Sequence, residues 1–212
     1  ELINKIRADG VGHVGFEYEL PFREKNRRKF SGDYQAVGSF WSLDETFPKL
    51  ESYKQTLFFD TLGILSGQGD GTFLGETLNY SIGRNKADEV FVDLNGGVNF
   101  NKFALPNKFL TSFLHGRSQW NGRLIIGSGS NLLKVKSNLH GVGSTLPHPF
   151  DKEAGVSLDS EIHFNRLESG ERVLVLKIVN LLAARISQQG RDTSGKVSIG
   201  ANSRGEKVDN GL

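Results

Sequence analysis

The residues with the strongest potential for chemistry are cations and aromatic rings that share one stretch free of acids. Residues 94–150 are 57 consecutive positions without Asp or Glu. About six acids would be expected there if the acids of the chain were spread evenly. The cations of the stretch are Lys102, Lys108, Arg117, Arg123, Lys134 and Lys136. Phe100, Phe103 and Trp120 are interleaved with them, and the formal charge of +2 for the whole chain hides this local excess.

A second basic segment repeats the combination near the start of the chain. Residues 22–30 begin and end with phenylalanine and contain five cations, among them Arg27, Arg28 and Lys29. In proteins that bind single-stranded nucleic acid, cations follow the phosphates and aromatic faces stack on unpaired bases. The two segments therefore predict a sequence-tolerant nucleic-acid interface. In the simpler alternative, the aromatic rings are core and the cations are the outward positions of the same strands.

Motifs for enzymatic chemistry are weak in this sequence. It contains no phosphate-binding P-loop, no nucleophile elbow, no HExxH motif and no cysteine, which excludes disulfides and thiolate metal sites. His140 and His148 flank a loop that could bind a metal, although a plain loop is the simpler interpretation. Asp159 and Glu161 could form an acid/base pair, but a solvated strand face is the simpler interpretation. We expect no enzymatic activity, no cofactor and no metal.

The elements that must position the interface are mainly strands. Glycine is abundant, at 26 residues, and His13–Leu20 alternates between apolar and polar residues, which predicts a half-buried strand. Further strands are expected at 34–41, 72–82, 89–94, 123–126 and 132–137, with a hairpin formed by 155–166 and 171–182. Leu174 lies in an apolar run and is expected in the core. Trp120 has polar neighbours and is expected to be exposed.

One substantial helix is expected at Pro48–Leu62, where apolar residues recur at three- and four-residue spacing after a proline suited to the first turn. The glycine cluster at 67–71 would then form a turn. Residues 187–212 are polar and are predicted to be a flexible tail after a single β-rich domain, residues 1–186. No apolar run of ~18 residues is present, which argues against a membrane-spanning helix.

The segment Arg123–Lys136 combines an apolar strand, a Gly/Ser turn and an alternating strand that ends Lys-Val-Lys. With Gly155-Val-Ser-Leu158 after a long loop, it resembles the OB-fold single-stranded-DNA-binding proteins of tailed phages, over residues 123–182. The resemblance implies a partly open OB-like barrel that binds DNA during replication or recombination. The near-neutral end of this chain departs from the acidic tail of such proteins.

The resulting hypothesis is a mainly β protein with an OB-like barrel, one helix and a flexible tail, which binds single-stranded nucleic acid. Replication proteins are possible partners, no membrane partner is expected, and the expected location is the cytoplasm, of the host cell if the protein is viral. One alternative is a structural or assembly β-protein of a virion or envelope, whose basic face packs on a partner. Another is a β-barrel that binds a ligand or glycan.

Overall fold

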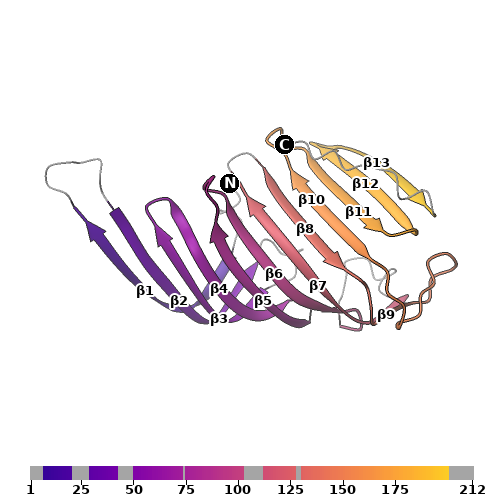
Figure 1. The fold of residues 1–212 in the computed structure, drawn as a ribbon, viewed down its shortest axis with the longest axis horizontal. Helices are drawn as coiled ribbons and strands as arrows, with labels where there is room; N and C mark the ends of the chain where they lie inside the picture. The colour runs from indigo at the N-terminus through magenta and orange to yellow at the C-terminus, as the bar shows by residue number, and fades with distance from the viewer. Residues whose placement is uncertain are drawn as a thin grey trace. The chain divides into compact units, whose positions relative to one another are not determined.

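The structure, a computed structural model, describes residues 7–20, 29–42, 50–73, 75–102, 112–127 and 130–200 (Figure 1). The strands are β1 (Arg7–Glu19), β2 (Lys29–Ser42), β3 (Leu50–Asp60), β4 (Gly63–Phe73), β5 (Glu76–Arg84), β6 (Val90–Asn99), β7 (Leu114–Ile126), β8 (Asn131–Ser137), β9 (Val142–Ser144), β10 (Ser160–Arg166), β11 (Arg172–Ile178), β12 (Leu182–Gln189) and β13 (Asp192–Ile199). These residues contain no helix, and hence none long and apolar enough to cross a membrane. The prediction of a mainly β fold is confirmed.

The strands are hydrogen-bonded in the order β1 to β8 and then β10 to β13, while β9 pairs with β7. Each strand therefore pairs with its neighbours along the chain, apart from the excursion through β9. β1 and β13 stand at opposite ends of this order and do not pair with each other, so the sheet is open. The predicted OB-like barrel is wrong, because closure would require a pairing between the two ends of the order.

The predicted helix at Pro48–Leu62 is also wrong, because residues 50–60 form β3. Along β3, Leu57 and Phe59 point to one side of the sheet and Phe58 to the other, as the register with β2 requires. The apolar residues of this segment fit a helical spacing by coincidence, and in the structure they follow the period-two alternation of a strand. Leu62 lies in the tight turn to β4, where its backbone N–H donates to Asp60 Oδ1 at 2.8 Å. The glycine cluster at 67–71 is part of β4, not a turn.

Most strand predictions agree with the structure, but their ends differ. His13–Leu20 corresponds to β1, and the segments 34–41, 89–94 and 132–137 fall within β2, β6 and β8. The apolar run 171–182 is not one strand: a turn at 179–181 separates β11 from β12. The expected flexible tail at 187–212 differs from the structure as far as Gly200, since β13 pairs with β12 along its whole length. Residues 201–212 lie outside the described residues.

The chain divides into two compact units. Unit 1 comprises residues 1–98 and 123–128, and unit 2 comprises residues 99–122 and 129–212. Each unit is described by itself. In both, period-two alternation gives the sheet one apolar and one polar face.

The register of β1 to β6 defines the two faces of unit 1. The apolar face of unit 1 consists of Val14, Phe16, Tyr18, Phe30, Tyr34, Ala36, Leu57, Phe59, Ile64, Leu78, Tyr80, Ile82, Val90, Val92 and Leu94, together with glycines and Gln55. The opposite face carries mainly charged and amide side chains, interrupted by Val37, Phe58 and Phe91. One apolar and one solvated face is the usual pattern of an antiparallel sheet that is covered on one side.

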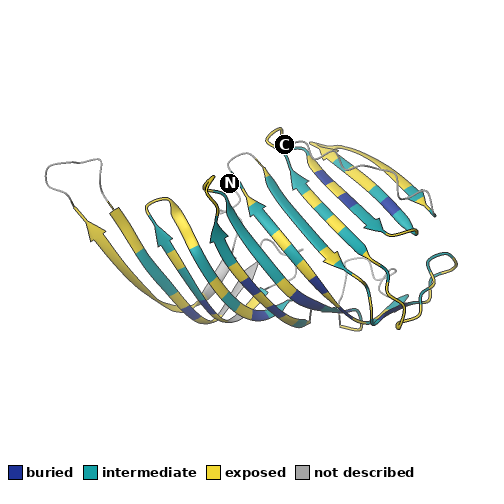
Figure 2. Ribbon diagram, in the orientation of Figure 1, coloured by how far each residue is buried: buried dark blue, intermediate teal, exposed yellow. Residues whose placement is uncertain are grey.

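Unit 2 shows the same division along β8 and β10 to β13. The apolar face of unit 2 consists of Leu133, Val135, Ile162, Phe164, Leu174, Leu176, Ile178, Leu182, Ala184, Ile186, Val197 and Ile199. Its polar face carries most of the lysine and arginine residues of these strands. Figure 2 shows that β1 in unit 1 and β13 in unit 2 are largely exposed, with the buried positions concentrated on more central strands.

Candidate functional site: the apolar sheet faces

Three phenylalanines form a ladder across the first three strands on the apolar face of unit 1. The ring centroids of Phe16 and Phe30 lie 6.0 Å apart, and those of Phe30 and Phe59 lie 5.4 Å apart. These separations are typical of aromatic pairs that attract each other. The outermost ring, Phe16, is 67% exposed. The ladder therefore joins neighbouring strands and also presents apolar surface to solvent.

Gly32 makes this ladder possible. The register places it directly opposite Phe16 on β1 and Phe59 on β3. A Cβ atom at this position would come within 2.7 Å of the Phe59 ring, closer than real Cβ atoms come. The Phe59 ring therefore packs directly on the backbone of Gly32, and no side chain projects from the apolar face at this point.

The more central strands of unit 1 bury their apolar side chains. Leu78 is 3% exposed and Tyr80 is 8% exposed. The Tyr80 hydroxyl donates to Gln55 Oε1 at 2.9 Å, and Gln55 itself is 2% exposed. This bond satisfies polar atoms that would otherwise be costly on an apolar face.

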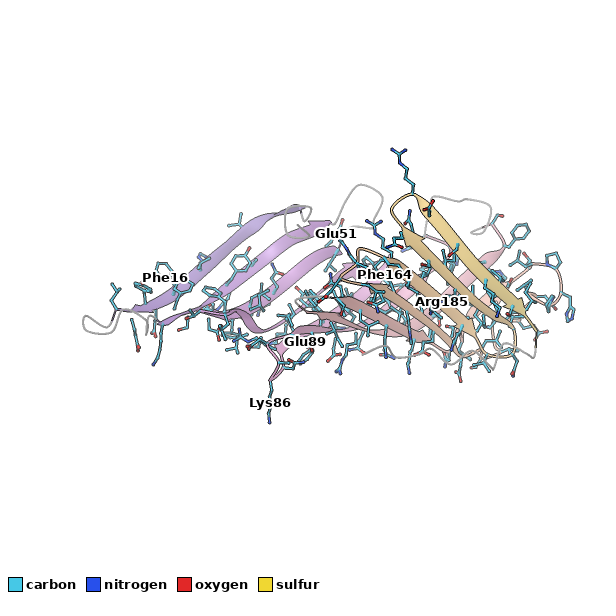
Figure 3. The ribbon with its side chains drawn as sticks, turned by 90° about the horizontal axis from the view of Figure 1, so that it is seen from above. Phe16, Glu51, Lys86, Glu89, Phe164 and Arg185 are labelled. Carbon is cyan, nitrogen blue, oxygen red and sulfur yellow. The ribbon has the colours of Figure 1, made fainter. Side chains whose placement is uncertain are left out.

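The apolar face of unit 2 has exposed side chains on β10, β11, β12 and β13, whereas Leu133 and Val135 on β8 are half-buried. Phe164 and Leu174 stand opposite each other on β10 and β11 and are each more than a third exposed, although Leu174 was expected in the core. Val197 and Ile199 on β13 are 60% and 57% exposed. Figure 3 shows the side chains along these strands and labels Phe164. Large apolar surfaces left uncovered in this way mark sites of interaction with lipids, ligands or other proteins.

Two arginine–carboxylate pairs join strands of unit 1; the register places Arg84 on the apolar side, opposite Val90, and Asp93 on the polar side. Arg84 Nη1 donates to Asp60 Oδ1 at 2.9 Å, and the Arg84 side chain is only 8% exposed. Arg123 Nη2 donates to Asp93 Oδ2 at 2.8 Å. The bond from each arginine lowers the pKa of its carboxyl group below the usual value. These pairs stabilise the sheet and leave the carboxylates no role as proton carriers near neutral pH.

In unit 2, β10 places a carboxylate among cations. Lys136 Nζ lies 3.4 Å from Glu161 Oε1, and His163 Nε2 lies 2.8 Å from the same oxygen without a well-aligned hydrogen bond. Partial burial raises the pKa of Glu161, but contact with His163 and the charge of Lys136 outweigh it, so the net shift is downward. Asp159 is exposed and directly precedes the first residue of β10.

The loop between β9 and β10 is held by Lys152. Its Nζ donates to the backbone oxygens of Leu139 at 2.9 Å and Val142 at 2.6 Å, and burial lowers the pKa of the amine. His148 Nδ1 lies 3.2 Å from Asp151 Oδ1, on the surface of this loop. Within the described residues, no three His, Asp or Glu side chains are grouped so that they could hold a metal ion.

The predicted nucleic-acid residues that the structure describes differ in exposure and in their partners. Trp120 is 8% exposed, so the expectation of an exposed stacking ring is wrong. Arg123 is paired with Asp93, and its guanidinium carbon lies 5.4 Å from the centroid of the Phe91 ring. Lys102 and Arg117 are exposed, and Phe100 is half-buried at the end of β6. Arg27, Arg28, Phe103 and Lys108 lie outside the described residues; Lys29, at the start of β2, pairs with Glu19 at 3.5 Å.

The acid-free stretch is not acid-free in three dimensions. Asp93 on β6 and Glu161 on β10 come from neighbouring strands and lie beside Arg123 and Lys136. Sequence reasoning missed the two apolar faces because it examined each strand alone. The signal was present: alternating strands follow one another along the chain, and no amphipathic helix is available in the described residues to cover their apolar sides.

Comparisons with known proteins give one match. A family model described as YhdP protein matches residues 1–212. This is not a family of phage single-stranded-DNA-binding proteins, so the resemblance over residues 123–182 was misleading. The nucleic-acid function and the viral and replication context that it implied are therefore wrong. No curated protein and no solved structure matches. The chain belongs to the YhdP protein family.

Proposed function

We propose that this chain is a structural β-protein of the bacterial envelope that holds lipid acyl chains against the apolar faces of its sheet. The exposure of those faces is the observation that carries the proposal: Phe16, Val197 and Ile199 are each more than half exposed. The family match supports the structural alternative drawn from the sequence more than the nucleic-acid hypothesis. The proposal replaces the sequence-based expectations of a cytoplasmic location and no membrane partner.

The free energy available from covering these faces is large. Burial of apolar surface contributes roughly 25 cal/mol per Å², or about 0.8 kcal/mol for each methylene group of a bound chain. A few methylene groups packed on side chains such as Phe164 and Leu174 would therefore offset several kcal/mol of ordering cost. Binding of this kind needs no directional contact, only a continuous apolar surface.

The chemistry of the faces favours acyl chains over a protein layer. A protein partner forms about one hydrogen bond per 100–200 Å² of interface. The buried polar groups on these faces are already satisfied within the sheet: Tyr80 bonds to Gln55 in unit 1, and Ser118 bonds to Ser137 in unit 2, with their Oγ atoms 3.1 Å apart. Acyl chains have no hydrogen-bonding groups, so these faces match them.

The geometry of the rows also suits a long apolar ligand. Facing positions on neighbouring strands lie about 5 Å apart, so apolar side chains form rows that cross the strands. In unit 2 one such row runs through Phe164, Leu174 and Ile186 on β10, β11 and β12. A chain lying along this row would contact every strand that it crosses.

The proposal is tested by lipid occupancy of matched variants. The purified protein is extracted with organic solvent, the lipid is quantified by mass spectrometry, and binding of a fluorescent fatty acid is measured. Phe16→Glu in unit 1 and Val197→Glu in unit 2 place a charge on the apolar faces and are expected to lower binding at least tenfold when combined. The matched control, Phe58→Glu with Ser198→Glu, adds the same charges to the polar faces of the same two units and should leave binding intact.

Two results would contradict the proposal. One is protein that carries no lipid and does not bind the fluorescent fatty acid while it remains folded by circular dichroism. The other is equal loss of binding in the apolar-face pair and the polar-face pair. Formation of a stoichiometric complex with a second protein that is abolished by Phe16→Glu would instead support a protein layer on the face.

A further inference from the structure

The polar face of unit 2 carries five cations on four strands, β8, β11, β12 and β13, opposite the proposed lipid face. We call this set the basic band, and it consists of Lys134, Lys136, Lys177, Arg185 and Lys196. The register places these residues in two adjacent rows. One row holds Lys136, Glu161 and Lys177, and the next holds Lys134, His163, Val175, Arg185 and Lys196.

The charge of the two rows is strongly unbalanced. Glu161 is their only carboxylate, against the five cations of the basic band. Three further carboxylates of this face, Asp159, Glu171 and Asp192, lie beyond the rows near the turns. Glu171 accepts a bond from Ser187, Asp192 stands opposite Gln189, and Asp159 directly precedes β10. The polar face of unit 1 has no comparable excess, because Asp93 pairs with Arg123 and Glu19 pairs with Lys29.

The small apolar residues within this face are covered. Val173, Val175 and Ala183 point to the same side as the basic band and are buried, with Val175 8% exposed and Ala183 4% exposed. Long cationic side chains can cover such positions with their methylene stems and keep their charged ends in water. The band therefore presents charge, not apolar area, to a partner. Figure 3 labels Arg185, one of its exposed members.

These features select among anionic partners. None of the paired positions on this face is Phe, Tyr or Trp, so it offers no ring on which a base could stack. An acidic protein would normally be anchored by aromatic or arginine residues in pockets, whereas here the cations are spread over a broad strand surface. To bind a membrane surface of anionic headgroups, a protein needs only several cations on one face, and each cation contributes about the same attraction.

We infer that the basic band docks unit 2 on the surface of a bilayer that contains anionic phospholipids. Contact through the polar face leaves the apolar face on the other side of the sheet open. This inference concerns a different face from the proposed acyl-chain site and does not depend on it. The two can fail separately.

Vesicle sedimentation tests the docking. The protein is mixed with vesicles of phosphatidylcholine alone or of phosphatidylcholine with phosphatidylglycerol, at about 0.1 M and about 1 M salt, since screening becomes strong over this range. Binding is expected only with phosphatidylglycerol and only at the lower salt. In the triple variant Lys136→Gln, Arg185→Gln and Lys196→Gln, partitioning should fall about fivefold per cation, or about a hundredfold in all.

The matched control removes three exposed cations from unit 1 by Lys29→Gln, Lys54→Gln and Lys86→Gln, and should bind as the original protein does. Should the band variant fail to fold, Lys136→Arg with Lys196→Arg keeps the charges and should keep the binding. Binding to neutral vesicles, binding that survives high salt, or equal loss in the band and control variants would overturn the inference. Fatty-acid binding by the band variant should stay unchanged, which separates this result from a failure of the proposed function.

Discussion

Replacement of Trp120 tests whether the structure or the sequence-based expectation describes this ring. The side chain is 8% exposed on β7, between the exposed residues Gln119 and Asn121. Truncation of a buried aromatic ring typically costs about 3–5 kcal/mol, through lost transfer free energy and an unfilled cavity. For a chain of this size, each kcal/mol lowers the melting temperature by about 2–4 °C. We therefore expect Trp120→Ala to lower it by about 6–20 °C.

The assay is thermal unfolding followed by far-ultraviolet circular dichroism, which does not depend on tryptophan fluorescence. Trp120→Phe keeps an aromatic ring and should lose less than half as much as Trp120→Ala. Phe16→Ala, at a ring that is 67% exposed, should cost under about 1 kcal/mol. A loss below about 1 kcal/mol for Trp120→Ala would refute the argument, because it would mean that the ring is solvated.

Three further changes follow from particular contacts. The bond from Arg84 lowers the pKa of Asp60 in the folded state. The ionised Asp60 therefore stabilises the fold above the ordinary carboxyl pKa, and this stabilisation is lost as the pH falls through the lowered value. In urea titrations at several pH values, the free energy of unfolding of Asp60→Asn should fall less steeply at acidic pH than that of the original protein. Gly32→Val should destabilise by about 1–3 kcal/mol because Cβ meets the backbone oxygen of Gly15 as well as the Phe59 ring, and Gly32→Val with Phe59→Ala should recover only the part of the loss that comes from the ring. Lys152→Met should cost about 1–3 kcal/mol through unsatisfied carbonyls and speed amide exchange in the loop before β10, whereas unchanged exchange would contradict the role of its ammonium group.

Alternation predicted the individual strands well because it is a local property of the chain. His13–Leu20 and the segments 132–137 and 155–166 were predicted as strands and overlap with β1, β8 and β10, although β10 begins only at Ser160. The helix at Pro48–Leu62 failed for the same reason, since a few residues can satisfy both periods at once. Only pairing with β2 and β4 on either side decides between them, and this information is not local.

The candidate site depended on relations between strands that the sequence does not display. Residues 94–150 are free of acids only along the sequence, because Asp93 and Glu161 on adjacent strands form ion pairs with two of their cations. The polar neighbours of Trp120 in the sequence indicated an exposed ring. In a strand, however, successive side chains point to opposite faces, so a buried residue normally has outward-facing polar neighbours. The apolar faces required the register of several strands together, which fixes the side to which each residue points.

The pairing of strands in sequence order has a consequence for how such a protein can change in length. Along β1 to β6 each strand pairs antiparallel with the strand before it in the sequence. Insertion or deletion of a whole hairpin shifts the chain by two strands and leaves the register of the flanking pairs unchanged. The side to which every remaining residue points is then preserved. Such a sheet can be lengthened or shortened in modular steps, with its two-sided character retained at each step.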